Sequence, residues 1–303
     1  MMEITGPILA KSKMKEPSPH VDYSEHGANW PETCTEYSLE QSPLNLSWEE
    51  AEANEYIHFD LLYTHALNNA TVAIEGDGTT IKINYPNQQD NDIRVWNERR
   101  EDQSYHLSHM VWKVPSEHTI NDRQLSAELQ IYHIQYATNR QVALSMLFDN
   151  ELALKNDANS LKTCFFEAFD FLKATPASTN IIDVPLKEFI NFMPQTKFAY
   201  YYGSETQPDC NESVTWLVNL EPSVITEEQV AQLTALLDAD TQASGGNYRN
   251  IQVLNERTIY SFNNEGDWER PAEKKSAEES ESFAAMTWIS NSVLVAAALL
   301  AMF

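Results

Sequence analysis

The stretch from Ser104 to Ile134, SYHLSHMVWKVPSEHTINDRQLSAELQIYHI, decides the fold, because polar and apolar residues alternate along two of its runs. Such alternation is typical of β-strands, whose successive side chains point to opposite faces of a sheet. The stretch also holds four histidines, three carboxylates and a lysine. This mixture suggests a metal site, and a catalytic zinc ion requires three protein ligands that reach one point.

The alternation assigns the side chains of the two runs to faces. Two of the faces, one from each run, are expected to face the core. They carry Met110 and Trp112 on the first run, together with His106 and Val114, and Leu129, Ile131 and His133 on the second. The other pair, which would line a polar cavity, takes His109, Val111, Lys113, Glu128, Gln130 and Tyr132. The cavity side therefore offers one histidine. His106 and His109 are expected to face opposite ways and cannot bind the same ion.

Further strand-like runs flank this stretch, separated by Gly, Asn, Asp and Pro, as in a sheet of many strands. We expect a single domain over residues 21–262. Two helices are predicted, at 161–174 and at 226–239, and the second opens with a capping-box pattern at Thr226, Glu228 and Gln229. The predicted strands cover residues 71–76, 80–85, 105–114, 125–136, 141–148, 213–220 and 251–255.

Composition limits the partners. The 303 residues include 45 acidic and 20 basic side chains, which gives a formal net charge of -25. This balance argues against nucleic acid, whose phosphates must be neutralised by Lys and Arg. An acidic surface keeps a protein soluble and favours cationic partners.

The two ends of the chain differ from the domain between them. Residues 1–20 are expected to form a polar leader, in which charges and prolines interrupt any apolar run of the signal-peptide type. Residues 263–282 are charged and poor in apolar residues, which predicts a flexible stalk. Residues 283–303 carry no charge, and a helix of that length is about as long as a bilayer is thick.

The apolar tail at 283–303 has two interpretations. It is a transmembrane helix, in which Ser290, Asn291 and Ser292 would favour contacts with other helices. Alternatively it is a GPI signal, with small residues such as Ser276, Ala277 or Ser280 as the attachment site. Either interpretation makes the membrane a partner of the chain.

Six motifs resemble the α-type carbonic anhydrase family, in the family's order, from Tyr23 to Arg257. They are YSEHGANWPETC, QSPLNL, PSEHTIND, AELQIYHI, YYYGSETQPDCNESVTWLV and NYRNIQVLNER. The resemblance implies a mostly β fold of the α/β class: one domain around a large, mainly antiparallel twisted sheet with a conical cavity.

The resemblance also locates the positions of the family's three zinc-binding histidines, at Val111, Lys113 and Gln130. Valine has no donor atom, an ammonium group repels a cation, and an amide oxygen is a weak zinc ligand. We therefore expect the zinc site to be lost and no cofactor to be bound. The position of the family's proton-shuttling histidine is Ala70.

Other family positions are retained. Thr206 matches the threonine that orients the zinc-bound hydroxide, Glu117 the carboxylate that accepts its hydrogen bond, and Glu128 the carboxylate that orients the third histidine. Without a metal, their expected role is to hold loop and strands in register. The former substrate pocket is expected at Tyr132, Glu205, Val214 and Trp216.

The cysteines indicate a compartment. Cys34 and Cys210 match the pair that is bridged in secreted members of the family, which predicts a disulfide and an oxidising compartment at the cell surface or along the secretory route. Cys164 is expected to be a buried thiol. Three N-glycosylation sequons, at Asn45, Asn69 and Asn211, agree with such a compartment.

The sequence therefore predicts a catalytically inactive carbonic anhydrase-like protein, held at a membrane, that serves in binding or assembly with a protein partner. One alternative is an active or weakly active carbonic anhydrase with a non-standard site, and another is a structural subunit of a membrane complex. We also predict that Lys113 pairs with Glu128 or Glu117 in place of the metal's charge, unless its side chain extends to solvent through the cavity mouth.

Overall fold

A computed structural model describes residues 20–35, 38–63, 67–75, 78–85, 91–99, 101–151, 180–184 and 196–264. Three of the predicted features lie outside these residues: the helix at 161–174, Cys164 and the tail at 283–303. Of the predicted stalk at 263–282, the structure describes residues 263 and 264. The strands are β1 (Asn45–Leu46), β2 (Glu52–Ala53), β3 (His58–Tyr63), β4 (Leu67–Glu75), β5 (Thr80–Asn84), β6 (Asn91–Trp96), β7 (Asp102–Lys113), β8 (Thr119–Ile120), β9 (Arg123–Gln124), β10 (Ala127–Gln135), β11 (Arg140–Asp149), β12 (Asn180–Val184), β13 (Lys197–Gly203), β14 (Val214–Asn219), β15 (Ser223–Val224) and β16 (Tyr260–Asn263). The helices are the short 3-10 helix η1 (Glu32–Cys34), α4 (Glu227–Thr234) and α5 (Ala239–Ala243).

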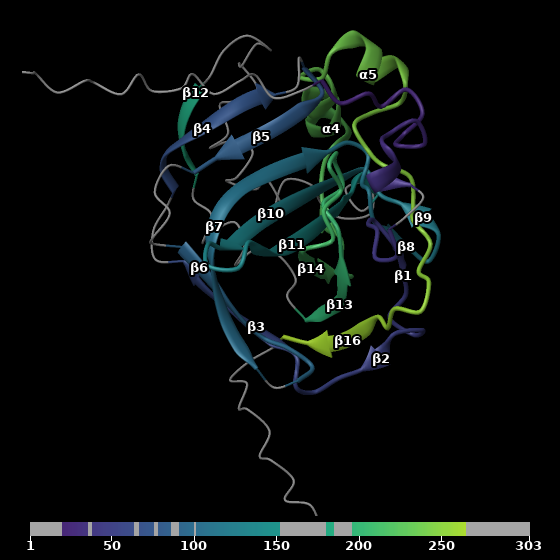
Figure 1. Cartoon of the computed structure of the whole chain (residues 1–303). Helices are drawn as coiled ribbons and strands as arrows, with labels where there is room; N and C mark the ends of the chain where they lie inside the picture. Colours follow the sequence, from purple (N-terminus) through teal and green to yellow (C-terminus); the bar gives the residue numbers. More distant parts are fainter. Residues whose placement is uncertain are drawn as a thin grey trace, which may run out of the picture. The chain divides into compact units, whose positions relative to one another are not determined.

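Most of these strands join one mixed sheet, whose main path runs β12-β4-β5-β7-β10-β11-β14-β13-β16-β2. Figure 1 shows the sheet curling along this path, with β7 as a long bent strand. One end of β7 pairs with β6, and its other end lies between β5 and β10. Parallel pairing occurs between β11 and β14, β11 and β15, and β16 and β2, and the other pairs of this sheet are antiparallel. The expected mostly β domain with a mainly antiparallel sheet is confirmed.

The core occupies both faces of the sheet centre. Met110, Trp112, Leu129 and Ile131 lie in one buried cluster, as their alternation predicts. His133 is also fully buried on that side, where its Nε2 lies 2.6 Å from the hydroxyl of Tyr63. The other face carries a second buried cluster, which includes Val111, Tyr132, Val214 and Trp216. The face that was expected to line a cavity is therefore largely packed.

A β-bulge in β7 overturns one prediction about its histidines. Tyr132 pairs with His109, but His133 pairs with Leu107 and Ile134 with His106, so the register shifts by one residue. The extra residue reverses the alternation, as bulges do. Leu107 therefore joins the core, and His106 and His109 point to the same side of the sheet. They serve separate partners: His106 lies 2.8 Å from Asp92, and His109 stacks on Tyr132.

Two further predictions need correction. Residues 251–255 form no strand and lie on the surface, where Val253 is 73% exposed, because this segment pairs with no strand edge. The helix predicted at 226–239 ends at Thr234 as α4, and Asp238 caps a separate short helix, α5, by accepting hydrogen bonds from two of its first amides. The predicted capping box at Thr226 is present, with Gln229 as its second member.

Helices long and apolar enough to cross a membrane do not occur among the residues that the structure describes. The described helices are short: α4 has eight residues and α5 has five.

Candidate functional site

The register of β7 and β10 brings together the three positions that the sequence singled out. Val111 pairs with Gln130, and Lys113 pairs with Glu128. All four residues are buried, and they face the second apolar cluster rather than the main core. The sequence prediction that these side chains share one face is confirmed.

Lys113 lies at the centre of this site and is completely buried. Its Nζ is 2.7 Å from Oε1 of Glu117 and donates a second, longer hydrogen bond of 3.3 Å to the hydroxyl of Tyr23. Burial acts to lower the pKa of Lys113, but Glu117 and Tyr23 outweigh it and raise that pKa above its ordinary value. Pairing with Glu117 confirms the predicted buried pair, and the alternative of a lysine that extends to solvent is wrong.

Glu117 accepts hydrogen bonds from three donors. Besides the ammonium group of Lys113, its carboxylate accepts Nε2 of Gln130 at 2.8 Å and the backbone N–H of Arg249 at 2.9 Å. The carboxylate that the resemblance assigns to the hydrogen bond of the threonine therefore accepts three hydrogen bonds from other parts of the chain.

Glu128 accepts a second set of hydrogen bonds. The donors are the backbone N–H groups of Glu117 and His118, at 2.8 and 2.9 Å, and the side chains of His118, Gln130 and Ser145, at 2.8 to 2.9 Å. Burial acts to raise the pKa of Glu128, but His118 and these donors lower it to about 2. Glu128 is therefore an anion whose role here is to hold β10, β11 and the 117–118 turn together.

The three side chains at 111, 113 and 130 do not fit a zinc ion. Val111 supplies no donor, and the ammonium group of Lys113 repels a cation. The amide oxygen of Gln130 already accepts the hydroxyl of Tyr132 at 3.0 Å, while its nitrogen donates to Glu117 and Glu128. Within the described ranges, no group of three His, Cys, Asp or Glu side chains could hold a metal ion.

A small pocket of about 170 Å³ remains beside this network. Tyr132 narrows it, with its ring stacked 4.8 Å from that of His109 and edge-on to Trp216 at 5.8 Å. Glu205 lines the pocket and accepts a hydrogen bond of 2.6 Å from Gln141. The full lining is Lys82, His109, Val111, Gln130, Tyr132, Glu205, Thr206, Gln207 and Pro208.

Thr206 and Ala70 stand apart from the network. Thr206 is buried, and its Oγ1 makes no hydrogen bond of normal geometry among the described residues, although it interacts with the hydroxyl of Tyr132. Ala70 lies in β4 and pairs with Ile182 of β12. The structure therefore brings together Glu117, Glu128, Gln130 and Lys113, with Thr206 on the pocket wall.

The disulfide expected from the resemblance is present and joins Cys34 to Cys210, whose Cα atoms lie 5.3 Å apart. Arg249 ties this region to the site. Its guanidinium donates to the carbonyl oxygens of Ser42 and Cys34 and to Oε1 of Gln41, and its backbone N–H reaches Glu117. Sequence reasoning did not single out Arg249 or Tyr23, although both stand in the quoted motifs.

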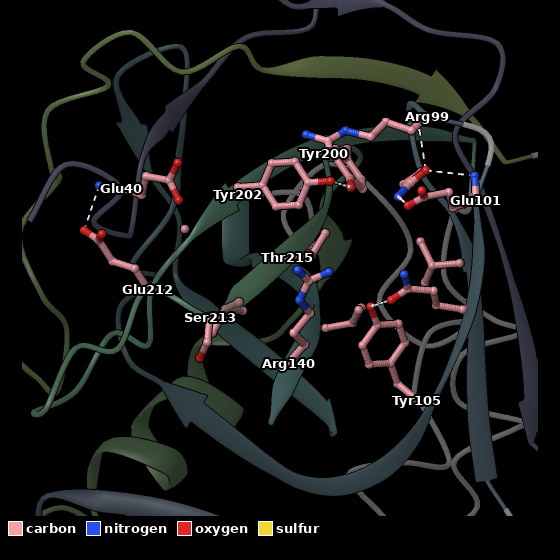
Figure 2. A pocket seen from close by; sticks show the side chains of 16 residues that line it. Glu40, Arg99, Glu101, Tyr105, Arg140, Tyr200, Tyr202, Glu212, Ser213 and Thr215 are labelled. Atoms are coloured by element: carbon pink, nitrogen blue, oxygen red, sulfur yellow. Dashed lines mark hydrogen bonds between the residues drawn. The ribbon is translucent and has the colours of Figure 1, made fainter. Parts of the chain in front are cut away.

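Another pocket, of about 430 Å³, opens elsewhere on the sheet. Figure 2 shows Arg140 projecting into it, with Tyr200 and Tyr202 near one wall and Glu40 and Glu212 near another. Tyr202 donates its hydroxyl to the carboxylate of Glu98. The lining comes from segments far apart in the sequence, and the sequence analysis did not predict this pocket.

Comparisons with known proteins agree with the fold. The chain matches the family model described as eukaryotic-type carbonic anhydrase over residues 25–263. Carbonic anhydrase 12 from Homo sapiens is 26% identical over 214 residues, which cover 64% of this chain and 58% of that protein. Putative carbonic anhydrase 3 from Caenorhabditis elegans is 27% identical over 254 residues, which cover 79% of this chain and 95% of that protein. The chain spans about half the length of several other curated relatives, such as 54% of alpha carbonic anhydrase 7 from Arabidopsis thaliana.

Solved structures share the fold. Carbonic anhydrase Cah3 from Chlamydomonas reinhardtii, in complex with acetazolamide, has a TM-score of 0.62 at 19% identity and covers 84% of this chain and 99% of its own. Dioscorin complexed with ascorbate also has a TM-score of 0.62, at 18% identity, and covers 80% of this chain and 95% of its own. At these identities the likeness concerns the fold alone.

Proposed function

Because the chain belongs to the eukaryotic-type carbonic anhydrase family, we propose that it is a catalytically inactive member whose domain serves in binding or assembly. One observation carries the proposal: the buried ion pair of Lys113 and Glu117, 2.7 Å apart, at the place where the resemblance puts a zinc ligand and its hydrogen-bonding network. A cation there would meet an ammonium group instead of an imidazole.

Charge accounting supports the same proposal. A zinc ion would bring two positive charges to a pocket that contains Glu117 and Glu128, and a buried carboxylate without a partner is costly. Here Lys113 neutralises Glu117, while His118, Gln130 and Ser145 donate to Glu128. The fold therefore supplies donors from its own chain to both carboxylates, without needing the charge of a metal ion.

A membrane location is the second part of the proposal, and it rests on the uncharged run at 283–303. The disulfide adds an oxidising compartment for the domain. Detergent extraction of the full chain from cell membranes, with and without a phosphatidylinositol-specific phospholipase, tests this part. Release by the phospholipase supports a GPI anchor, release by detergent alone supports a transmembrane helix, and recovery without either treatment contradicts a membrane location.

The function itself is tested by three measurements on the purified full chain: metal content after dialysis, the rate of CO₂ hydration, and the proteins that co-purify in stoichiometric amounts. We expect substoichiometric zinc, hydration at the uncatalysed rate and at least one stable protein partner. One zinc per chain together with hydration that a sulfonamide inhibits would contradict the proposal. A partner found only in a fixed membrane assembly would favour a structural subunit.

An active enzyme with a non-standard site is the second candidate. It is favoured by Thr206, whose buried hydroxyl lines the remaining pocket and makes no hydrogen bond of normal geometry within the described part of the chain. In that case hydration would depend on Thr206, and its substitution by valine would abolish a measurable activity. Under the leading proposal the same substitution has no activity to remove.

A further inference from the structure

The three sequons of the chain stand in different surroundings. Asn45 lies in β1 and is half-buried, and its side-chain amide makes three hydrogen bonds. Its Oδ1 accepts the hydroxyl of Thr119 and the backbone N–H of Asp122, both at 2.8 Å, and its Nδ2 donates to Oδ1 of Asp122 at 2.8 Å. These bonds fasten β1 to the turn between β8 and β9. A sugar on Nδ2 of Asn45 would compete with Asp122 for the same space.

Asn211 has the opposite surroundings. It is exposed, and it follows Cys210 in the loop between β13 and β14. Its Nδ2 makes one long hydrogen bond, of 3.3 Å, to Oε2 of Glu205. Glu205 would keep its shorter bond to Gln141, of 2.6 Å, if that contact were lost. The sequon is bent into a compact turn, in which the backbone N–H of Ser213 donates to the carbonyl oxygen of Asn211 at 2.9 Å.

We propose that Asn211 is an N-glycosylation site and that Asn45 is left unmodified. The co-reactant is a lipid-linked oligosaccharide of the secretory route. The amide nitrogen of Asn211 attacks C1 of the first sugar, the N–C1 bond forms, and the C1–O bond to the lipid diphosphate breaks. One amide proton is lost, and the lipid diphosphate leaves with the bonding electrons. The Cys34–Cys210 disulfide points to the compartment in which this transfer takes place.

The glycan would stand beside two pockets. Glu205, the neighbour of Asn211, lines the small pocket next to Lys113, and Glu212 and Ser213 line the pocket of Figure 2. A bulky, hydrated sugar at this point is solubilising and marks solvent-facing surface. A protein partner would therefore contact a different face of the domain.

The test expresses the full chain in eukaryotic cells and compares the wild type with four variants. Peptide-N-glycosidase digestion in ¹⁸O water converts a glycosylated asparagine to labelled aspartate, which peptide mapping assigns to one residue. We expect the label at Asn211 and none at Asn45. Asn211→Gln and Ser213→Ala should both lose that glycan, Asn45→Gln should keep it, and Asn69→Gln separates any contribution from the remaining sequon.

The readout does not require a stable fold, because the mass of a misfolded chain still reports the glycan. An unlabelled Asn211 in a chain whose Cys34–Cys210 bridge has formed would overturn the proposal. So would label at Asn45, or a wild-type chain that carries free Cys34 and Cys210 thiols and no glycan, because the chain then never reaches the required compartment.

Discussion

Nζ of Lys113 lies 2.7 Å from Oε1 of Glu117, and the two side chains are 1% and 0% exposed. A buried ion pair of this kind adds little to the free energy of unfolding when it is compared with an apolar pair of the same shape, because both charges lose their hydration on folding. Removing one partner is different, since the other charge is then buried alone. The relationship between Lys113 and Glu117 is therefore visible in the stability of single variants.

The first prediction is that Lys113→Ala lowers the free energy of unfolding by ~3 to 5 kcal/mol, because the carboxylate of Glu117 loses its counter-charge. Urea denaturation followed by tryptophan fluorescence measures the loss. Lys197→Ala is the control at an exposed lysine, whose Nζ lies 5.5 Å from the ring centroid of Trp48. It should lower the free energy of unfolding by at most about 1 kcal/mol.

A double-mutant cycle makes this prediction specific. In a Glu117→Gln background, Lys113→Ala should lower the free energy of unfolding much less, because position 117 then carries no buried anion that needs a counter-charge. A Glu128→Gln background should change the cost less, since Glu128 bonds to His118, Gln130 and Ser145 and not to Lys113. Losses that simply add in the Glu117 cycle would show that the two residues act independently.

The second prediction concerns zinc. The wild-type domain should bind no stoichiometric zinc, whereas the triple variant Val111→His, Lys113→His and Gln130→His should bind it. Glu128 is already placed to orient a histidine at 130, because it now accepts Nε2 of Gln130 at 2.9 Å. Metal analysis after dialysis checks both proteins. Retaining Lys113 in a double-histidine variant should prevent binding, and zinc in that control would contradict the role given to the ammonium group.

Much of the fold and part of the site followed from the sequence alone. The alternation in β7 and β10 placed Val111, Lys113 and Gln130 on one face correctly, because side-chain parity is a local property. The buried pairing of Lys113 followed from the charge that a missing metal leaves behind. Tyr23 and Arg249 were missed, since they reach the site from 90 and 136 residues away from Lys113 and no local pattern reports such contacts.

The bulge in β7 explains the main error. A single extra residue near Ser108 reverses the parity of everything before it, so His106 moved to the face of His109. The sequence SHM carries no glycine or proline that would announce the bulge. The run IQVLN at 251–255 is a separate error: its alternation is strand-like, but the segment lies on the surface and joins no strand ladder, with a backbone hydrogen bond from Gln252 to Pro43.

The third prediction uses His133. Burial lowers the pKa of His133 to about 3, far below its ordinary value of 6.5. The folded protein therefore binds fewer protons than the unfolded chain between these two values, and stability falls as the pH drops from about 6.5 toward about 3, with a slope of at most about 1.4 kcal/mol per pH unit. Above pH 6.5 this contribution is constant.

His133→Gln should flatten that slope, because glutamine does not titrate. Urea denaturation at pH 7 and pH 5 compares the two proteins in a window above the range in which Glu128, with a pKa of about 2, begins to lose its contribution. Equal slopes in wild type and variant would mean that His133 is not held neutral in the fold.

The fourth prediction concerns the Cys34–Cys210 disulfide, which closes a loop with a sequence separation of 176 residues. By restricting so long a loop in the unfolded chain, the disulfide raises the free energy of unfolding by on the order of 4 to 5 kcal/mol. The variant Cys34→Ser with Cys210→Ser should therefore unfold at a lower urea concentration than the oxidised wild type. A reducing agent should bring the wild type down to the same midpoint, and a midpoint that does not respond to reduction would contradict the prediction.

The last prediction concerns Thr206, which distinguishes an inactive binding domain from an enzyme. Its hydroxyl is buried, and among the residues of known placement it makes no hydrogen bond of normal geometry. Replacing an unsatisfied buried hydroxyl with a methyl group of the same shape removes a desolvation penalty of about 1 to 3 kcal/mol. Thr206→Val should therefore leave stability unchanged or raise it, Thr206→Ser should not gain in the same way, and neither should change CO₂ hydration from the uncatalysed rate. If Thr206→Val instead abolished a measurable hydration rate that Thr206→Ser preserved, the hydroxyl would be orienting a reactant, and the chain would be an enzyme that uses the pocket beside Lys113.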